Sequence, residues 1–143
     1  AARRPVFPAR ERVRRGLVLF LSAGLGGLAA EIVKGVVRRH RPGETGRYVF
    51  DWFVGPGYDG PGLGLASSHA GVAFGAAFML MRLFPGTGPI VVLLAIGCAW
   101  TRLLAGAHFA TDVVVAAMMS YAVARLLPLG PFARPRVRPL YLP

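Results

Sequence analysis

Two residues four positions apart, His108 and Asp112, form the pair most suggestive of chemistry in this chain. On a helix, positions i and i+4 share one face, so the carboxylate can hold the imidazole in a single tautomer and orientation. Arg102 precedes the pair, and the flexibility of Gly106 would let the chain turn back so that Arg102 and His108 meet. A histidine and an aspartate at this spacing are, by themselves, only weak evidence for catalysis.

Two cations lie at the end of the first apolar segment, in the sequence KGVVRRHRP. Lys34 and Arg41 are seven residues apart, almost two helical turns, so on a helix both would project from nearly the same face. Lys34 is the only lysine in the chain, and a charge near the end of an apolar span is costly. Taken alone, Lys34 is better explained by snorkelling to an interface or by an i,i+3 pair with Glu31.

A third group, Ser67, Ser68 and His69, lies where a further apolar segment begins. The first backbone N–H groups of a helix are unpaired and lie at the positive end of its dipole, which favours a bound phosphate. A serine that caps the helix explains the two serines equally well. His69 alone is more typical of an ordinary interfacial histidine.

The elements that must position these groups are four apolar stretches, each near the lower end of the ~17 to 25 residues that span a bilayer. They cover residues 16–37, 69–84, 89–105 and 113–128. All four are predicted to be helices, in a membrane bundle rather than in a soluble one. Ala23 with Gly27, and Gly71 with Gly75, have the four-residue spacing that lets membrane helices approach closely.

The segment 38–67 between the first two stretches is predicted to be an active-site loop. Its part 43–66 holds seven glycines, which favours turns over regular structure. Five aromatic residues also lie there: Tyr48, Phe50, Trp52, Phe53 and Tyr58. They are expected either to sit at the level of lipid headgroups or to pack the loop onto the helix ends.

The composition favours a membrane protein. Hydrophobic residues make up 55% of the 143 and charged residues only 16%, which is unusual for a soluble protein. Arginines dominate the net charge of +11 and gather in the central loop and in two tails, 1–15 and 131–143, so a basic nucleic-acid groove is disfavoured. Cys98 is the only cysteine, which excludes an intrachain disulfide and a cysteine-based zinc cluster.

The basic tails predict how the chain is oriented, because arginines flanking apolar spans usually mark cytoplasmic ends. Counting crossings from a cytoplasmic N-terminus places the loops 38–67 and 105–112 on the same, opposite side of the membrane. The C-terminal tail then returns to the cytoplasm. The chemically interesting groups would all lie at or near that one non-cytoplasmic face.

Together and in this order, the three groups resemble the signature of the phosphatidic acid phosphatase type 2 and vanadium haloperoxidase superfamily: K-x-x-x-x-x-x-R-P, then P-S-G-H, then S-R-x-x-x-x-x-H-x-x-x-D. The resemblance covers residues 34–112 and is to the membrane lipid phosphatase branch. It implies an all-α fold, with 1–143 a single integral membrane domain of about four transmembrane helices. These are similar to the last four helices of six-helix members, so two further spans are expected upstream.

The resemblance implies a role for each matching residue around a phosphoryl group. Five residues are expected to bind its oxygens: Lys34, Arg41, Arg102, Ser67 and the backbone N–H of Ser68. Three others are expected to carry the chemistry. His108 would attack phosphorus to give a phosphohistidine, Asp112 would orient His108, and His69 would protonate the leaving oxygen and then activate water. No metal and no cofactor are implied.

The sequence departs from the signature at three positions. Ala66 replaces the proline, Ser68 the glycine, and Thr101 the serine before the arginine. A side chain on residue 68 could crowd the close backbone approach to phosphate that glycine permits. A residue at a helix start needs no positive φ, however, so serine is compatible with that position.

The function expected from the sequence is hydrolysis of a lipid phosphomonoester or pyrophosphate, such as phosphatidic acid, phosphatidylglycerophosphate or a polyprenyl pyrophosphate. The expected location is a bacterial inner membrane, with the site on the non-cytoplasmic face, no nucleic-acid partner and no obligatory protein partner. One alternative is a haloperoxidase with vanadate in the same cradle, although soluble relatives of that kind need no apolar spans. The other is a non-catalytic membrane protein that binds anionic lipid headgroups.

Overall fold

The computed structural model describes residues 8–42, 46–48, 50 and 62–129. Within these ranges the chain is helical and has no β-strand, which confirms the predicted all-α class. The elements in order are α1 (Ala9–Val37), α2 (Ser68–Leu83), the short 3₁₀ helix η1 (Pro85–Thr87), α3 (Gly88–Leu104) and α4 (Ala110–Leu126). Each expected apolar stretch corresponds to one α-helix, and α1 begins earlier than expected, so part of the basic segment 1–15 is helical.

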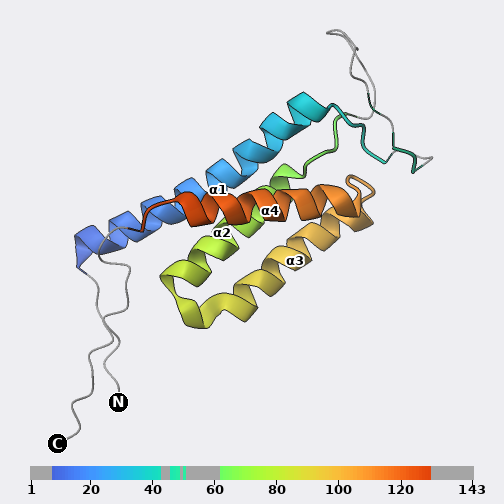
Figure 1. Ribbon diagram of the computed structural model, residues 1–143. Coiled ribbons are helices and arrows are strands. Elements are labelled where there is room, and N and C mark those ends of the chain that lie inside the picture. The colour runs from blue at the N-terminus through green and yellow to red at the C-terminus, as the bar shows by residue number, and fades with distance from the viewer. Residues whose placement is uncertain (1–7, 43–45, 49, 51–61, 130–143) are drawn as a thin grey trace, which may run out of the picture.

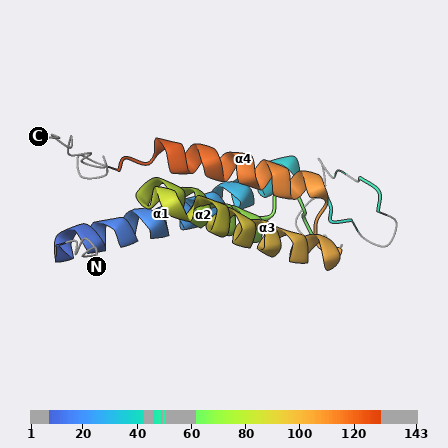
Figure 2. The ribbon, with the colours of Figure 1, turned by 90° about the horizontal axis from the view of Figure 1, so that it is seen from below.

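Helix α2 packs against all three of the other α-helices, and α1 also packs against α4 (Figure 1). The end of α1, the start of α2, the end of α3 and the start of α4 lie at the same end of the bundle in both ribbon views (Figures 1 and 2). That end is called the loop end below. It carries all three groups that the sequence singles out, as their place in the chain predicts.

Small residues allow α1 and α2 to approach closely. A Cβ on Gly71 would lie 2.6 Å from the carbonyl oxygen of Gly26, and one on Gly75 would lie 2.5 Å from that of Ser22. Hydroxyl groups reinforce the contact, because Ser22 Oγ donates to the Gly75 carbonyl at 2.8 Å and Ser120 Oγ of α4 donates to that of Gly71 at 2.8 Å. The predicted role of the glycine spacing on α2 is confirmed.

Two of the described helical segments, rather than the expected four, are long and apolar enough to cross a membrane: Ala9–Val37 and Pro85–Leu104. Helices α2 and α4 have 16 and 17 residues. Helix α2 packs against the three other α-helices and α4 packs against α1 and α2, and both helices bury small residues in these contacts. Their apolar side chains are therefore partly explained by packing within the bundle. The expectation of four helices is therefore confirmed, whereas only two of them are candidate membrane spans.

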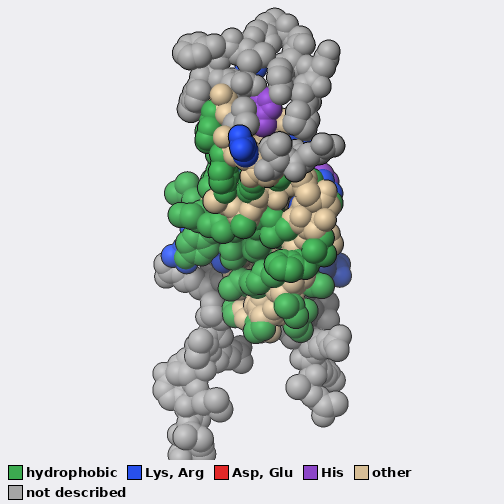
Figure 3. All heavy atoms as spheres, turned by 90° about the vertical axis from the view of Figure 1, so that its right-hand side faces the viewer, with side chains coloured by type: hydrophobic (Ala, Val, Ile, Leu, Met, Phe, Trp, Pro, Cys, Tyr) green, Lys and Arg blue, Asp and Glu red, His purple; other side chains and the backbone are tan. Residues whose placement is uncertain are grey.

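The outer surface is strongly hydrophobic. Large side chains of α3, including Ile90, Leu93, Leu94 and Trp100, are more than half exposed. Figure 3 views the molecule from the side of the loop end and shows hydrophobic side chains over much of that face. Histidine and some basic side chains lie in its upper part, and further basic side chains lie at its flanks.

The close approach of α1 and α2 predicts that a methyl group added at their contact lowers the stability of the protein. We expect Gly71→Ala to destabilise the protein by about 1–3 kcal/mol, because the new Cβ meets backbone rather than a movable side chain. Gly24→Ala is the matched control: nothing lies within 4 Å of its Cβ position, so the variant should be neutral or gain up to about 1 kcal/mol of helix propensity. Thermal unfolding in detergent measures both, and equal stability of the two variants would contradict the packing described.

Candidate active site

His108 is buried at the loop end and is held through one ring nitrogen. Its Nδ1 lies 2.9 Å from the carbonyl oxygen of Gly64 and 3.3 Å from Oδ2 of Asp112. A carbonyl oxygen can only accept a hydrogen bond, so Nδ1 must carry the proton. In the neutral ring, Nε2 then keeps its lone pair, which is the form that a nucleophile or a base requires.

The contact between His108 and Asp112 arises differently from the prediction. His108 precedes α4, which begins at Ala110, so the two residues do not share a helix face. Asp112 lies in the first turn of α4 and reaches back, and its Oδ2 also accepts the backbone N–H of Phe109 at 2.8 Å. The same carboxylate therefore caps the helix and holds the imidazole.

Asp112 is fully buried and is paired with a residue that the sequence analysis did not select, Arg39. The Nη2 of Arg39 bonds to Asp112 Oδ1, and Nη1 donates to Thr111 Oγ1 at 3.0 Å. Its guanidinium carbon lies 4.9 Å from the ring centres of both Tyr48 and Phe109. Arg39 is one of four basic residues in the run 38–41, and its spacing from the motif residues does not distinguish it from the other three. The one signal in the sequence that could have identified a partner for Asp112 is general: a buried carboxylate needs a cation.

The two ends of the loop are joined to each other and to α4. Residues 39–41 run antiparallel to 62–64: the N–H of Gly64 donates to the Arg39 carbonyl at 2.7 Å and that of Arg41 to the Gly62 carbonyl at 3.0 Å. The N–H of Ser67 donates to the Asp112 carbonyl at 3.3 Å. This pairing brings the Gly64 carbonyl to His108.

Part of the aromatic cluster packs onto the helix ends. Tyr48 stacks on Phe109 with ring centres 4.3 Å apart, so for this residue packing is the better of the two interpretations. Trp52, Phe53 and Tyr58 lie outside the described residues.

The three predicted phosphate-binding cations lie in different settings. Helix α1 ends at Val37, with Arg38 in the left-handed region at φ 49°, so Lys34 and Arg41 are not on one helix face as expected. Lys34 pairs with Glu31 at 2.6 Å, the alternative that the sequence left open. Arg41 is partly buried, with Nε 3.5 Å from the Leu63 carbonyl.

Arg102, in the last turn of α3, is the least engaged of these cations. Its Nε is buried and has no hydrogen-bond partner among the described residues. Gly106, at φ +63°, turns the chain back as predicted, and the N–H of Ala107 donates to the Arg102 carbonyl at 3.2 Å. The described contacts include no hydrogen bond between Arg102 and His108.

The start of α2 supplies the remaining predicted residues. Ser67 is buried and caps the helix, its Oγ accepting from the N–H of Ala70 at 3.4 Å. Ser68 is the first helical residue and has no positive φ, so serine in place of glycine creates no backbone strain. The hydroxyl of Thr101 turns back to the Cys98 carbonyl at 2.7 Å instead of pointing to the site.

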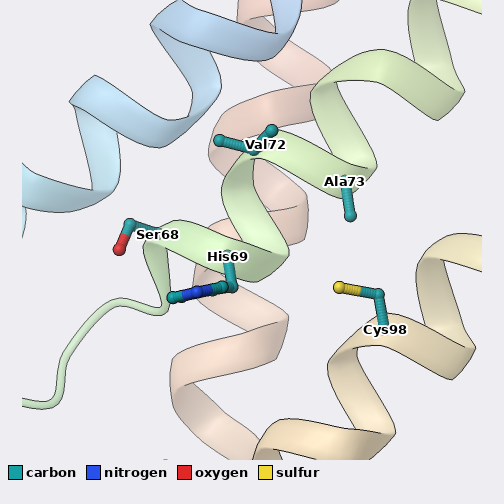
Figure 4. A pocket seen from close by; sticks show the side chains of 5 residues that line it. All are labelled: Ser68, His69, Val72, Ala73 and Cys98. Atoms are coloured by element: carbon teal, nitrogen blue, oxygen red, sulfur yellow. The ribbon is translucent and has the colours of Figure 1, made fainter.

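His69 is exposed and lines a pocket of about 370 Å³ between α2 and α3, together with Ser68, Val72, Ala73 and Cys98. Figure 4 shows Ala73 and Cys98 facing each other across the gap, with His69 nearer the start of α2. Ser68 and His69 lie one helical turn before Val72 and Ala73, and Arg102 lies one turn after Cys98. The polar residues Ser68, His69 and Arg102 therefore form a layer at the loop end. Val72, Ala73 and Cys98 form an apolar layer of the pocket one helical turn further into the bundle.

The described residues contain no group of three His, Cys, Asp or Glu side chains that could hold a metal ion. His108, Asp112 and Ser67 are linked by hydrogen bonds. Lys34 in the last turn of α1, Arg41 after it, His69 in the first turn of α2 and Arg102 in the last turn of α3 belong to segments that meet at the loop end. Chemically, these are groups from which an anion site could be built.

Comparison with known proteins identifies the family of this chain. The family model of the PAP2 superfamily matches residues 15–136. No curated protein and no solved structure matches the chain. The family match covers most of the sequence, including every residue of the candidate site, and it shows that the chain belongs to the PAP2 superfamily, a family of phosphatases that act on phosphoesters.

Proposed function

We propose that this protein hydrolyses the phosphomonoester or pyrophosphate of a lipid, without a metal or cofactor, through a phosphohistidine on His108. One observation carries the proposal: the Nδ1–H of His108 is bound by the Gly64 carbonyl and faces Asp112, which leaves the Nε2 lone pair for phosphorus. A protein that only bound anionic headgroups would have no use for a buried imidazole held in one tautomer.

The reaction follows in two steps. Nε2 of His108 forms a bond to phosphorus while the bond from phosphorus to the leaving oxygen breaks, and His69 gives that oxygen a proton. His69 then takes a proton from a water molecule, whose oxygen attacks phosphorus, so that inorganic phosphate leaves and His108 is regenerated. The carboxylate of Asp112 offsets the positive charge that the ring carries in between.

Stabilising the phosphoryl charge is the proposed task of the cations at the loop end. Arg102 offers a buried guanidinium nitrogen without a partner among the described residues, and Arg41 lies at the base of the paired loop ends. Lys34 would exchange Glu31 for a phosphoryl oxygen. The N–H of Ser68 at the start of α2 and the hydroxyl of Ser67 complete the proposed cradle.

The two-layered pocket supports a lipid as the substrate. If His69 protonates the leaving oxygen, the rest of the leaving group lies on the same side as His69, against the pocket. The pocket walls one turn further along the helices are hydrocarbon and sulfur, contributed by Val72, Ala73 and Cys98. Such walls suit the carbon chain of a phosphorylated lipid better than a sugar or nucleotide.

The proposed setting is a membrane, most simply a bacterial inner membrane with the loop end on the non-cytoplasmic face. Support comes from the two long apolar segments, from the exposed apolar side chains of α3 and from the arginines at the opposite end of α1. A lipid phosphate is then the partner, with no nucleic acid and no obligatory protein partner.

Substitutions of the two histidines should block different steps of the reaction. With labelled lipid phosphate in EDTA, the wild type should turn over, and His108→Ala should form no phosphoenzyme. His69→Ala should still phosphorylate His108 from a substrate with a good leaving group, and then stall, about 10²- to 10⁴-fold slower in turnover. Rapid quenching, followed by acid and alkali treatment, detects phosphohistidine, which is acid-labile and alkali-stable.

Two results of that experiment would contradict the assignment. If His108→Ala accumulates the acid-labile species and His69→Ala does not, the roles are reversed. If EDTA abolishes activity and magnesium restores it, the reaction depends on a metal.

A bulky side chain in the pocket should lower the hydrolysis of lipid phosphates that carry long hydrocarbon chains. We expect Cys98→Phe to lower kcat/KM for a long-chain lipid phosphate by at least about 10-fold, since the ring occupies space lined by Ala73 and Val72. Hydrolysis of p-nitrophenyl phosphate should change little. Ile96→Phe, on the exposed face of α3, is the control, and an equal loss on both substrates for Cys98→Phe would remove the pocket from substrate binding.

Cysteine labelling tests the orientation. In a Cys98→Ser background, a membrane-impermeant maleimide added to intact cells should react with Tyr58→Cys in the loop and should not react with Arg12→Cys at the other end of α1 until the cells are lysed. The opposite pattern would place the site in the cytoplasm.

A further inference from the structure

Arg39 and Asp112 form a buried ion pair directly behind the proposed nucleophile. Arg39 is 4% exposed and Asp112 is 0% exposed. Removing two such charges from water is costly unless geometry and hydrogen bonds compensate for it. The pair therefore persists only because its surroundings bind both partners closely.

The carboxylate oxygens of Asp112 are divided between two tasks. Oδ1 bonds to Arg39, whereas Oδ2 accepts from the N–H of Phe109 and faces Nδ1 of His108. Rotation of the carboxylate would break the bond to Arg39. Arg39 therefore determines which oxygen is presented to the imidazole, and at what angle.

Arg39 is itself held by a pair of stacked aromatic rings and through both terminal nitrogens. Tyr48 and Phe109 lie over the guanidinium, which favours a planar arginine over a lysine. Its terminal nitrogens bond to Asp112 and Thr111. Only its buried Nε has no hydrogen-bond partner among the described residues.

We propose that Arg39 is a positioning residue of this site, which holds the carboxylate of Asp112 aligned so that the ring of His108 keeps the orientation required for attack. It acts through Asp112 and does not bind the phosphoryl group, in contrast to Arg41 and Arg102. The inference rests on the proposed function, because alignment of His108 matters to the reaction only if His108 is the nucleophile.

A double-mutant cycle on kcat tests this. Arg39→Gln should lower kcat for p-nitrophenyl phosphate by about 10- to 100-fold, a coupling of the size found between contacting residues. In an Asp112→Asn background the same substitution should cost less than about 3-fold, because the alignment is already lost. If the loss of kcat in the double variant equals the product of the losses in Arg39→Gln and Asp112→Asn, the two residues act independently and the proposal is overturned. Arg47→Gln, an exposed arginine of the same loop, should leave kcat unchanged.

Inhibition by vanadate separates positioning from phosphate binding. For Arg39→Gln the inhibition constant and KM should change less than about 3-fold, whereas Arg41→Gln should weaken vanadate inhibition. A parallel loss of kcat and vanadate affinity in Arg39→Gln would mean that its free Nε reaches the phosphoryl group, and would refute a pure positioning role. Should Arg39→Gln not fold, Arg39→Lys keeps the charge while it loses the planar fork, and the same comparison is made with it.

A readout that does not depend on activity keeps this inference distinct from the proposed function. In ¹⁵N-histidine NMR spectra of the protein in detergent, the signal that disappears in His108→Ala identifies His108. Its Nδ1–H resonance should shift or broaden in Arg39→Gln and remain unchanged in Arg47→Gln. An unaltered resonance in Arg39→Gln would overturn the positioning role. Absence of phosphatase activity in the wild type, with the expected NMR change, would instead refute only the proposed function.

Discussion

A carboxylate that is cut off from water must be satisfied by neighbouring charge and by hydrogen-bond donors, and Asp112 imposes this requirement on the loop end of the bundle. The segment that follows α1 provides a guanidinium, the start of α4 provides a backbone N–H, and the imidazole lies against the same oxygen. One buried group thereby determines how the end of α1 meets the start of α4. The proposed chemistry uses an arrangement that the fold already requires.

The packing of small residues in the middle of the bundle makes this arrangement possible. Gly71 and Gly75 bring α2 against α1, and hydroxyls from α1 and α4 bind their carbonyls. With α2 held centrally, its first turn lies beside the first turn of α4, where the N–H of Ser67 reaches the Asp112 carbonyl. Helix contacts far from the loop end therefore determine the separation of the functional groups.

How much could be predicted from the sequence depended on how local the signal was. Apolar runs located the four helices, because burial of a continuous apolar stretch leaves a direct trace in the chain. The pair of His108 and Asp112 was found from its spacing, although the contact is a capping interaction and not a shared helix face. The spacing of Lys34 and Arg41 wrongly predicted that both project from one helix face, because the helix ends between them.

Arg39 was missed for a related reason: its partner lies 73 residues away, and only the folded chain brings them together. The lengths of α2 and α4 were predicted well, but both helices were also counted as membrane spans, since apolar residues that pack in a bundle and residues that face lipid look alike in a sequence. The roles of the individual site residues in catalysis remain predictions. Spacing and geometry indicate which reaction steps a group is able to perform, and only kinetic measurements show which steps it performs.

The carbonyl of Gly64 makes one feature of the site robust to mutation. This main-chain oxygen selects the protonated nitrogen of His108, and no exchange of one amino acid for another deletes a main-chain oxygen. Under the proposed mechanism, a lineage that lost the aspartate would still inherit the correct tautomer, and with it a weakened catalyst on which selection could act. Dividing control of the imidazole between backbone and side chain buffers the site against mutational drift.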